Sequence, residues 1–330
     1  MSGNQKTAKR SANNPGAERI PSAFESPRPR PRTAGSPKHV LLLGATGMLG
    51  SAIYGVLKDR YKLVLAVRDL EKVRLLDDVY GGTSAHQCLH FDAAELYREY
   101  AEKKGAPGPV YSDFVEQVGP IDRVINAIGV TIPFTSRDPA LTLFVNGALP
   151  HILARTFGER MIHVTTDCVY SGAAGYPYDE NSPKSPVDLY GLSKSLGEPL
   201  DCLTIRTSIF GRELSGFTGL LEWFLQQEGK SIVGFANHYW NGITTQQFGV
   251  LCDTLMSAGN GFPKRGVFHV FSTPVSKYEM LRQFQAKYAV RCQIARDASQ
   301  SLNRCLSSVK ALNASLNVPS FDRMLADLRP

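Results

Sequence analysis

The sequence predicts an α/β fold built on a doubly wound parallel sheet, followed by a smaller mixed α/β lobe at the C-terminal end. Three observations predict it. From His39 onward, short apolar runs alternate with helix-like segments. The runs are apolar throughout, which is typical of strands covered on both faces. A glycine-rich turn separates the first run from the first helix-like segment.

Six strands are expected in the first part of the chain, over residues 39–43, 62–67, about 87–91, 122–128, 161–165 and 203–206. Helices are expected from about residue 48 and over about 140–158. Glycines and prolines within residues 98–120 predict a loop before the fourth strand.

The alternation loosens after about residue 210. Short strands are expected near 231–235 and 267–271, and helices near 216–228, 245–258 and 276–288. We therefore expect a first unit over 38–210 and a second lobe over 211–330, with a strand or helix exchanged between them as an open alternative.

The basic charge of the chain belongs to its N-terminal end. The 330 residues carry a formal net charge of +7, but residues 1–38 hold eight basic and two acidic side chains, so the rest is nearly neutral. Residues 1–37 are poor in apolar side chains, so we expect a disordered basic tail. We interpret it as a solvated extension rather than an arm for lipid or nucleic acid, and expect no nucleic-acid partner.

The uncharged run over residues 40–57 resembles a signal peptide or a membrane span. Four glycines interrupt it, so a strand, a turn and a helix explain it better, and we expect no membrane insertion. The six cysteines are scattered without a C-x-x-C pair, and the histidine spacing suggests no metal site. This pattern is typical of reduced thiols in a cytoplasmic protein.

The turn after the first strand carries the pattern Gly44-Ala-Thr46-Gly47-Met48-Leu49-Gly50. Glycines let the backbone turn tightly and approach a pyrophosphate, and the N-terminus of the next helix supplies N–H donors and a positive dipole end. The G-x-x-G-x-x-G spacing in this place predicts a dinucleotide site.

The ends of the second and third strands bear on the choice of dinucleotide. Arg68 follows the second strand and suits a 2′-phosphate, which favours NADP(H), whereas the adjacent Asp69 keeps NAD(H) open. Asp92, after the third strand, either meets the adenine amino group or caps the next helix.

A tyrosine and a lysine stand four residues apart, at Tyr190 and Lys194. On a helix both face the same side, and we expect the ammonium to lower the phenol pKa enough for acid–base work. Thr166 ends the fifth strand, at the edge where an open α/β sheet binds ligands, and offers a hydroxyl to the same substrate oxygen.

These motifs together resemble the extended short-chain dehydrogenases/reductases, and most closely their dTDP-4-dehydrorhamnose reductase branch. The matching segments are GATGMLG (44–50), INAIG (125–129), TTDCVYSG (165–172), YDENSPKSPVDLYGLSKSLGE (178–198) and IRTSIFGRE (205–213). Two segments depart from the family pattern: Cys168 replaces an aromatic residue, and residues 237–245 differ from the family's substrate loop.

The resemblance implies a Rossmann unit that binds NAD(P) over residues 38–210 and a lobe that binds the nucleotide sugar over 211–330. It also assigns roles to individual residues. Thr166, Tyr190 and Lys194 become the catalytic triad. The cofactor residues are then Gly44, Thr46, Gly47, Met48, Leu49, Arg68, Asp92, Asn126, Ala127, Gly129, Tyr190 and Lys194. The substrate residues are Thr131, Asn146, Asp167, Val169, Tyr170 and Trp240, with Asn146 helping to order the site.

The implied activity is NAD(P)H-dependent reduction of a nucleotide-linked 4-keto-6-deoxysugar, a step in the synthesis of surface polysaccharide precursors. Two alternatives stay open at this point: an NAD-dependent nucleotide-sugar epimerase or dehydratase, and a non-catalytic NADP-binding regulatory subunit. The sequence leaves the oligomeric state open, a homodimer included.

Overall fold

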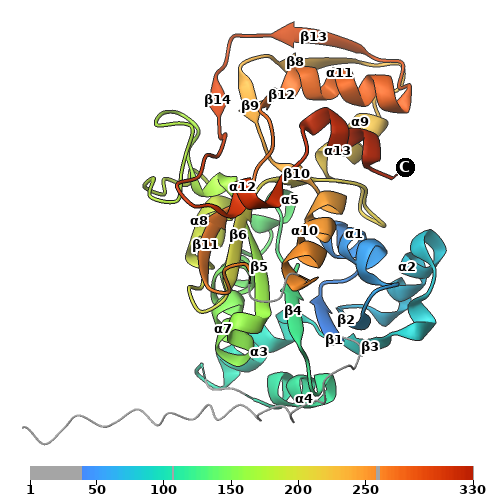
Figure 1. The fold of residues 1–330 in the computed structure, drawn as a ribbon, viewed down its shortest axis with the longest axis vertical. Helices are drawn as coiled ribbons and strands as arrows, with labels where there is room; N and C mark the ends of the chain where they lie inside the picture. The colour runs from blue at the N-terminus through green and yellow to red at the C-terminus, as the bar shows by residue number, and fades with distance from the viewer. Residues whose placement is uncertain (1–38, 106–107, 258–260, 330) are drawn as a thin grey trace, which may run out of the picture.

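The computed structural model describes residues 39–105, 108–257 and 261–329 (Figure 1). The predicted tail over residues 1–37 lies outside these residues. Among the described residues, parallel strands form one seven-stranded sheet. In spatial order its strands are β11 (Gly266–His269), β6 (Leu203–Thr207), β5 (Met161–Thr166), β4 (Arg123–Asn126), β1 (His39–Leu43), β2 (Lys62–Val67) and β3 (Gln87–His90). The predicted doubly wound parallel sheet is confirmed.

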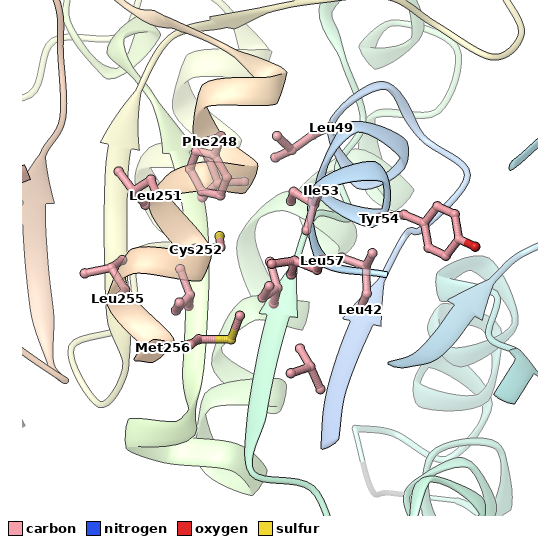
Figure 2. Packing of buried hydrophobic residues seen from close by; sticks show 14 of the residues in the cluster. Leu42, Leu49, Ile53, Tyr54, Leu57, Phe248, Leu251, Cys252, Leu255 and Met256 are labelled. Atoms are coloured by element: carbon pink, nitrogen blue, oxygen red, sulfur yellow. The ribbon is translucent and has the colours of Figure 1, made fainter. Parts of the chain in front are cut away.

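One face of this sheet is covered by helices from distant parts of the chain. In Figure 2, α1 (Met48–Leu57) packs beside α10 (Thr245–Ser257). The side chains that face each other there are Leu49, Ile53 and Leu57 from α1 and Phe248, Cys252 and Met256 from α10, whereas Leu251 and Leu255 lie on the other side of α10 in the same core. Each large apolar side chain buried in this way stabilises the fold by about 2 kcal/mol. Residues 245–257 thus return from the second part of the chain to the first sheet, as does β11.

The other face is covered by α3 (Ala93–Glu102), α4 (Pro109–Val118) and α7 (Leu149–Phe157). Residues 98–120 were expected to form a loop, and this prediction was wrong. Pro109 occupies the first turn of α4, where a proline is tolerated, and Tyr111, Phe114 and Val118 bury one side of that helix.

The helix expected over 140–158 is present but not uniform. It consists of α6 (Pro139–Leu143), a π-helical turn η3 (Phe144–Ala148) and α7. Such π turns are rare, and they frequently accompany functional residues.

Most of the elements after residue 208 form the small lobe in the upper part of Figure 1. Its strand pairs are β8 (Ser231–Phe235) with β13 (Gln293–Asp297), β9 (His238–Trp240) with β12 (Val275–Ser276) and β14 (Leu302–Asn303), and β7 (Ile209–Phe210) with β10 (Ile243–Thr244). Its helices are α9 (Leu220–Leu225), α11 (Lys277–Tyr288) and α13 (Phe321–Asp327), whereas α12 (Leu312–Leu316) packs beside β11 of the large sheet. Aromatic side chains, Phe210, Phe224, Trp240, Phe284 and Phe321 among them, fill its core.

Candidate active site

A cavity of about 580 Å³ opens at the carboxyl edge of the sheet. Its walls are the start of α1, the ends of β2, β4, β5 and β6, the helix α8 (Leu189–Leu196), and part of the segment 213–219. The strand order reverses between β1 and β4, and ligands of open α/β sheets bind at such a point. Parallel strands therefore bring together residues that lie about 170 positions apart.

The turn between β1 and α1 forms a cradle that fits a pyrophosphate. Gly44 has a φ of +78°, and a Cβ on Gly50 would lie 2.1 Å from the Gly44 oxygen. Within the described residues, no side chain caps α1 and no acidic residue stands in its first turn. Gly47, Met48 and Leu49 line the cavity, so the positive end of this helix faces it. Gly44 and Thr46 shape the turn without lining the cavity.

Of the side chains that follow β2 and β3, one lines the cavity and two accept hydrogen bonds from the backbone. Arg68 is exposed and lines the cavity, whereas the Asp69 carboxylate accepts the backbone N–H of Glu71 at 3.0 Å. The Asp92 carboxylate accepts the N–H of Ala94 at 2.9 Å and caps α3. Of the two roles considered for Asp92, capping is the one that the structure shows.

The three predicted catalytic residues converge on the cavity. α8 begins after Asp188, whose carboxylate accepts the N–H of Gly191 at 2.7 Å. Tyr190 and Lys194 stand one turn apart on this helix, and both line the cavity together with Thr166. Thr166 is 5% exposed, and its hydroxyl accepts the N–H of Cys168 and donates to the Asp167 carboxylate, both at 3.1 Å.

The electrostatics of this group differ from expectation. Lys194 was expected to lower the pKa of Tyr190, but burial raises the pKa of that phenol. The neighbouring Cys168 and Asp167 add to the rise, which the Thr166 hydroxyl only partly offsets. Burial also lowers the pKa of Lys194 to about 8 against the opposing effect of Glu198. Lys194 is not among the groups that contribute most to the pKa of Tyr190, and the loss of water dominates, so Tyr190 is held as a protonated phenol.

A tight wall over residues 127–134 closes one side of the cavity, and Ala127, Gly129 and Thr131 belong to it. A Cβ on Gly129 would lie 2.8 Å from Lys194 Nζ, so a glycine allows the close approach. Asn146, in the π turn, accepts the N–H of Val130 at 2.8 Å and donates to the Val130 oxygen at 2.9 Å. Asn146 thus orders this wall without lining the cavity.

Four of the predicted substrate residues lie away from the cavity wall. Val169 and Tyr170 are fully buried, and Tyr170 stacks on Tyr178 with ring centroids 4.3 Å apart. Trp240 is 6% exposed in the aromatic core of the lobe, and Asp167 is buried behind Thr166. Their side chains are part of the framework, because none of the four lines the cavity.

Sequence reasoning also missed part of the wall. Ser208 and Glu213 line the cavity, as do Ser215, Gly216, Thr218 and Gly219. The Glu213 carboxylate accepts the N–H groups of Thr218 and Gly219, at 3.1 and 2.5 Å, and so shapes this segment. The end of the sixth strand, within the IRTSIFGRE run, is the signal that points to these residues.

Other features bear on chemistry and location. Within the described ranges no group of three or more histidine, cysteine or carboxylate side chains is arranged to hold a metal ion. All six cysteines are free thiols. No helix in the described part of the chain is long and apolar enough to cross a bilayer.

A family model described as "RmlD substrate binding domain" matches residues 116–301, more than half of the chain. The chain belongs to this family. A Streptomyces griseus protein, "dTDP-4-dehydrorhamnose reductase", is 29% identical over 176 residues, which are 52% of this chain and 45% of that protein. The chain spans less than half the length of the first curated relatives that it matches.

Solved structures of RmlD-like proteins share the fold. A hypothetical dTDP-4-dehydrorhamnose reductase from Sulfolobus tokodaii superposes with a TM-score of 0.66 at 21% identity, covering 89% of this chain and all of that one. The Bacillus anthracis dTDP-4-dehydrorhamnose reductase in complex with NADP gives a TM-score of 0.63 at 17% identity, covering 89% and 99%. The Rossmann-like architecture of the first unit is therefore confirmed.

Proposed function

We propose that this RmlD-family chain is an NAD(P)H-dependent reductase of the keto group of a nucleotide-linked 4-keto-6-deoxysugar. The observation that carries the proposal is the meeting of Thr166, Tyr190 and Lys194 at one cavity with the glycine cradle of α1. A relative with this family's fold carries the name of such a reductase, and another is described with NADP. Another relative is named "Spore coat polysaccharide biosynthesis protein SpsK", and we propose that the product of this chain is a precursor of a surface polysaccharide.

The cavity fits a dinucleotide along its length. The N-terminus of α1 would hold the pyrophosphate, and Lys194 would hold the ribose next to the nicotinamide. Arg68 would bind a 2′-phosphate, which favours NADP(H), because Asp69 is engaged as a cap. NAD(H) stays the second choice. When bound, the reduced cofactor supplies the hydride.

Side chains of this chain supply the proton that the carbonyl oxygen takes up during the reduction. Tyr190 donates its phenolic proton to the oxygen of the substrate carbonyl as that oxygen gains negative charge, and its raised pKa keeps the proton in place until then. The Thr166 hydroxyl turns from Asp167 to hydrogen-bond the same oxygen. A donor that meets charge in the transition state accelerates such a step by about 10²–10³-fold.

We propose that the nucleotide sugar binds between the cavity and the lobe of residues 211–330. Within that range, residues 245–257 and 266–269 pack on the first sheet and are not part of the lobe. Free thiols at all six cysteines are in keeping with a cytoplasmic protein. Because the mechanism needs neither a metal site nor a membrane, the proposed partners are the nucleotide sugar and the cofactor.

A homodimer is also part of the proposal. Apolar side chains on and beside α8 are solvent-exposed, namely Val187, Leu192, Leu196 and Leu200, at 65%, 45%, 56% and 68%. Exposed charges stand beside the patch at Asp188 and Lys184. We propose a second copy of the chain as the partner that covers this apolar patch. Light scattering on the purified protein tests this, and a monomer at micromolar concentration would contradict it.

The activity is tested by NADPH oxidation, followed at 340 nm, with a panel of nucleotide-linked 4-keto-6-deoxysugars. The expected result is turnover that Tyr190→Phe lowers by about 10²–10⁴-fold while NADPH binding is kept. Absence of turnover with every member of the panel would reject the reductase. Tightly held NAD that copurifies with the protein would instead point to an epimerase or a dehydratase.

A further inference from the structure

His163 is a polar side chain in a position that an apolar one could fill. It lies in the middle of β5, is fully buried, and its Nε2 makes no hydrogen bond of good geometry among the described residues, although the Gly197 backbone is near the ring. A buried donor without a partner is unfavourable compared with an apolar side chain of similar size. Packing alone does not account for histidine here.

The other imidazole nitrogen has a defined partner. Nδ1 lies 3.1 Å from the Asn126 side-chain nitrogen, and Asn126 is 1% exposed at the end of β4. The Asn126 side-chain oxygen accepts the backbone N–H of Ile128 at 3.1 Å. Because the amide oxygen faces that donor, the amide NH₂ faces His163, and Nδ1 has to accept. The pair therefore fixes a neutral imidazole with its proton on Nε2.

The surroundings keep the imidazole neutral. Burial lowers the pKa of His163 to about 3, the charges of Lys194 and His151 act in the same direction, and the Gly197 backbone opposes them. Protonation would place two donors against each other at Nδ1 and a second positive charge near Lys194. The acceptor is thus present throughout the neutral pH range.

The hydrogen bonds from His163 lead to the cavity wall. Asn126 holds the N–H of Ile128, and residues 127–129 line the cavity. Gly129 follows directly and lies against Lys194 Nζ. Asn146 holds the next residue, Val130, from the other side. Two amides therefore fix the wall, and His163 holds the NH₂ end of the first of them by accepting its hydrogen bond.

We propose that His163 is a positioning residue for dinucleotide binding: as an obligate acceptor it orients Asn126, which holds the 127–129 wall in place beside Lys194. The inference rests on the cofactor-binding part of the proposed function and on no property of the sugar. It assigns a role in binding to a side chain that is buried beneath the cavity and touches no ligand.

The test compares two variants of similar size. His163→Asn can place its oxygen where Nδ1 stands and keeps the acceptor, whereas His163→Leu removes it. NADPH affinity is measured by fluorescence titration, and thermal unfolding is recorded for both. We expect His163→Leu to weaken NADPH binding about tenfold, equivalent to about 1.4 kcal/mol, and His163→Asn to stay within about threefold of wild type. Equal affinities in the two variants would overturn the inference.

A measurement on the wild type covers the case in which His163→Leu does not fold. ¹⁵N NMR of the labelled imidazole is expected to show the neutral Nε2–H tautomer from pH 8 down to about 5. An Nδ1–H tautomer or an imidazolium in that range would also overturn the inference. Failure of the wild type to bind any nicotinamide dinucleotide would instead reject the proposed function, so the two failures are distinguishable.

Discussion

Replacing Lys194 by methionine is expected to stabilise the protein while removing its activity. The ammonium is 6% exposed, and burial lowers its pKa from 10.5 to about 8. Each pKa unit corresponds to about 1.4 kcal/mol, so holding the charged form in the folded state costs up to about 3 kcal/mol at pH 7. Methionine keeps the apolar stem in the same space and has no charge to desolvate.

The sign of the pH dependence follows from proton binding. Between about pH 8 and 10.5 the unfolded chain binds the lysine proton and the folded chain does not, so wild-type stability rises with pH in that window as far as Lys194 is concerned. The advantage of Lys194→Met should therefore fall from about 3 kcal/mol at pH 7 to about 2 kcal/mol at pH 9.

Urea unfolding at the two pH values measures this difference, with the exposed Lys62→Met as the control. A Lys194→Met protein that is less stable than wild type at pH 7, or an advantage that grows with pH, would refute the reasoning. At saturating NADPH the wild type should become more stable than Lys194→Met, because only the wild type has the lysine that binds the cofactor.

Three further predictions concern the cavity wall and the cofactor. Arg68→Gln should weaken NADPH binding by about tenfold or more and leave NADH binding unchanged; equal losses for both would remove the 2′-phosphate assignment. Gly50→Ala should destabilise the fold by several kcal/mol, since its Cβ would overlap the Gly44 oxygen, and a wild-type unfolding midpoint would contradict the cradle. Thr166→Val should lower kcat by about 10²-fold at unchanged NADPH affinity, and an unchanged kcat would exclude its hydroxyl from the reaction.

The sheet was predictable because its strands are apolar on both faces and short. β1 and β2 have the predicted bounds, and the other strands of the first unit differ by a few residues. The placement of β11 beside β6 was not predictable, because a run of four residues carries no sign of its partner. The error over residues 98–120 arose because glycine and proline at 105–109 separate two helices rather than mark one loop.

The site residues also include some that the sequence could locate and others that it could not. Residues at strand ends, such as Arg68 and Thr166, gather by topology, and a motif on one helix keeps Tyr190 and Lys194 together. Val169 and Tyr170 follow Thr166 in sequence, yet the turn after β5 directs them into the framework. The segment 213–219 is shaped by hydrogen bonds to Glu213, and only its first residue, at the end of the IRTSIFGRE run, could be located from the sequence.

A crystal structure of the chain with NADPH tests the central claim most directly, which is that the cavity over the carboxyl edge of the sheet is a dinucleotide site ending at Tyr190. The account predicts the pyrophosphate at the backbone N–H groups of Met48 and Leu49, with the nicotinamide beside Tyr190 and Lys194. A dinucleotide bound elsewhere, or a nicotinamide far from the Tyr190 hydroxyl, would contradict it.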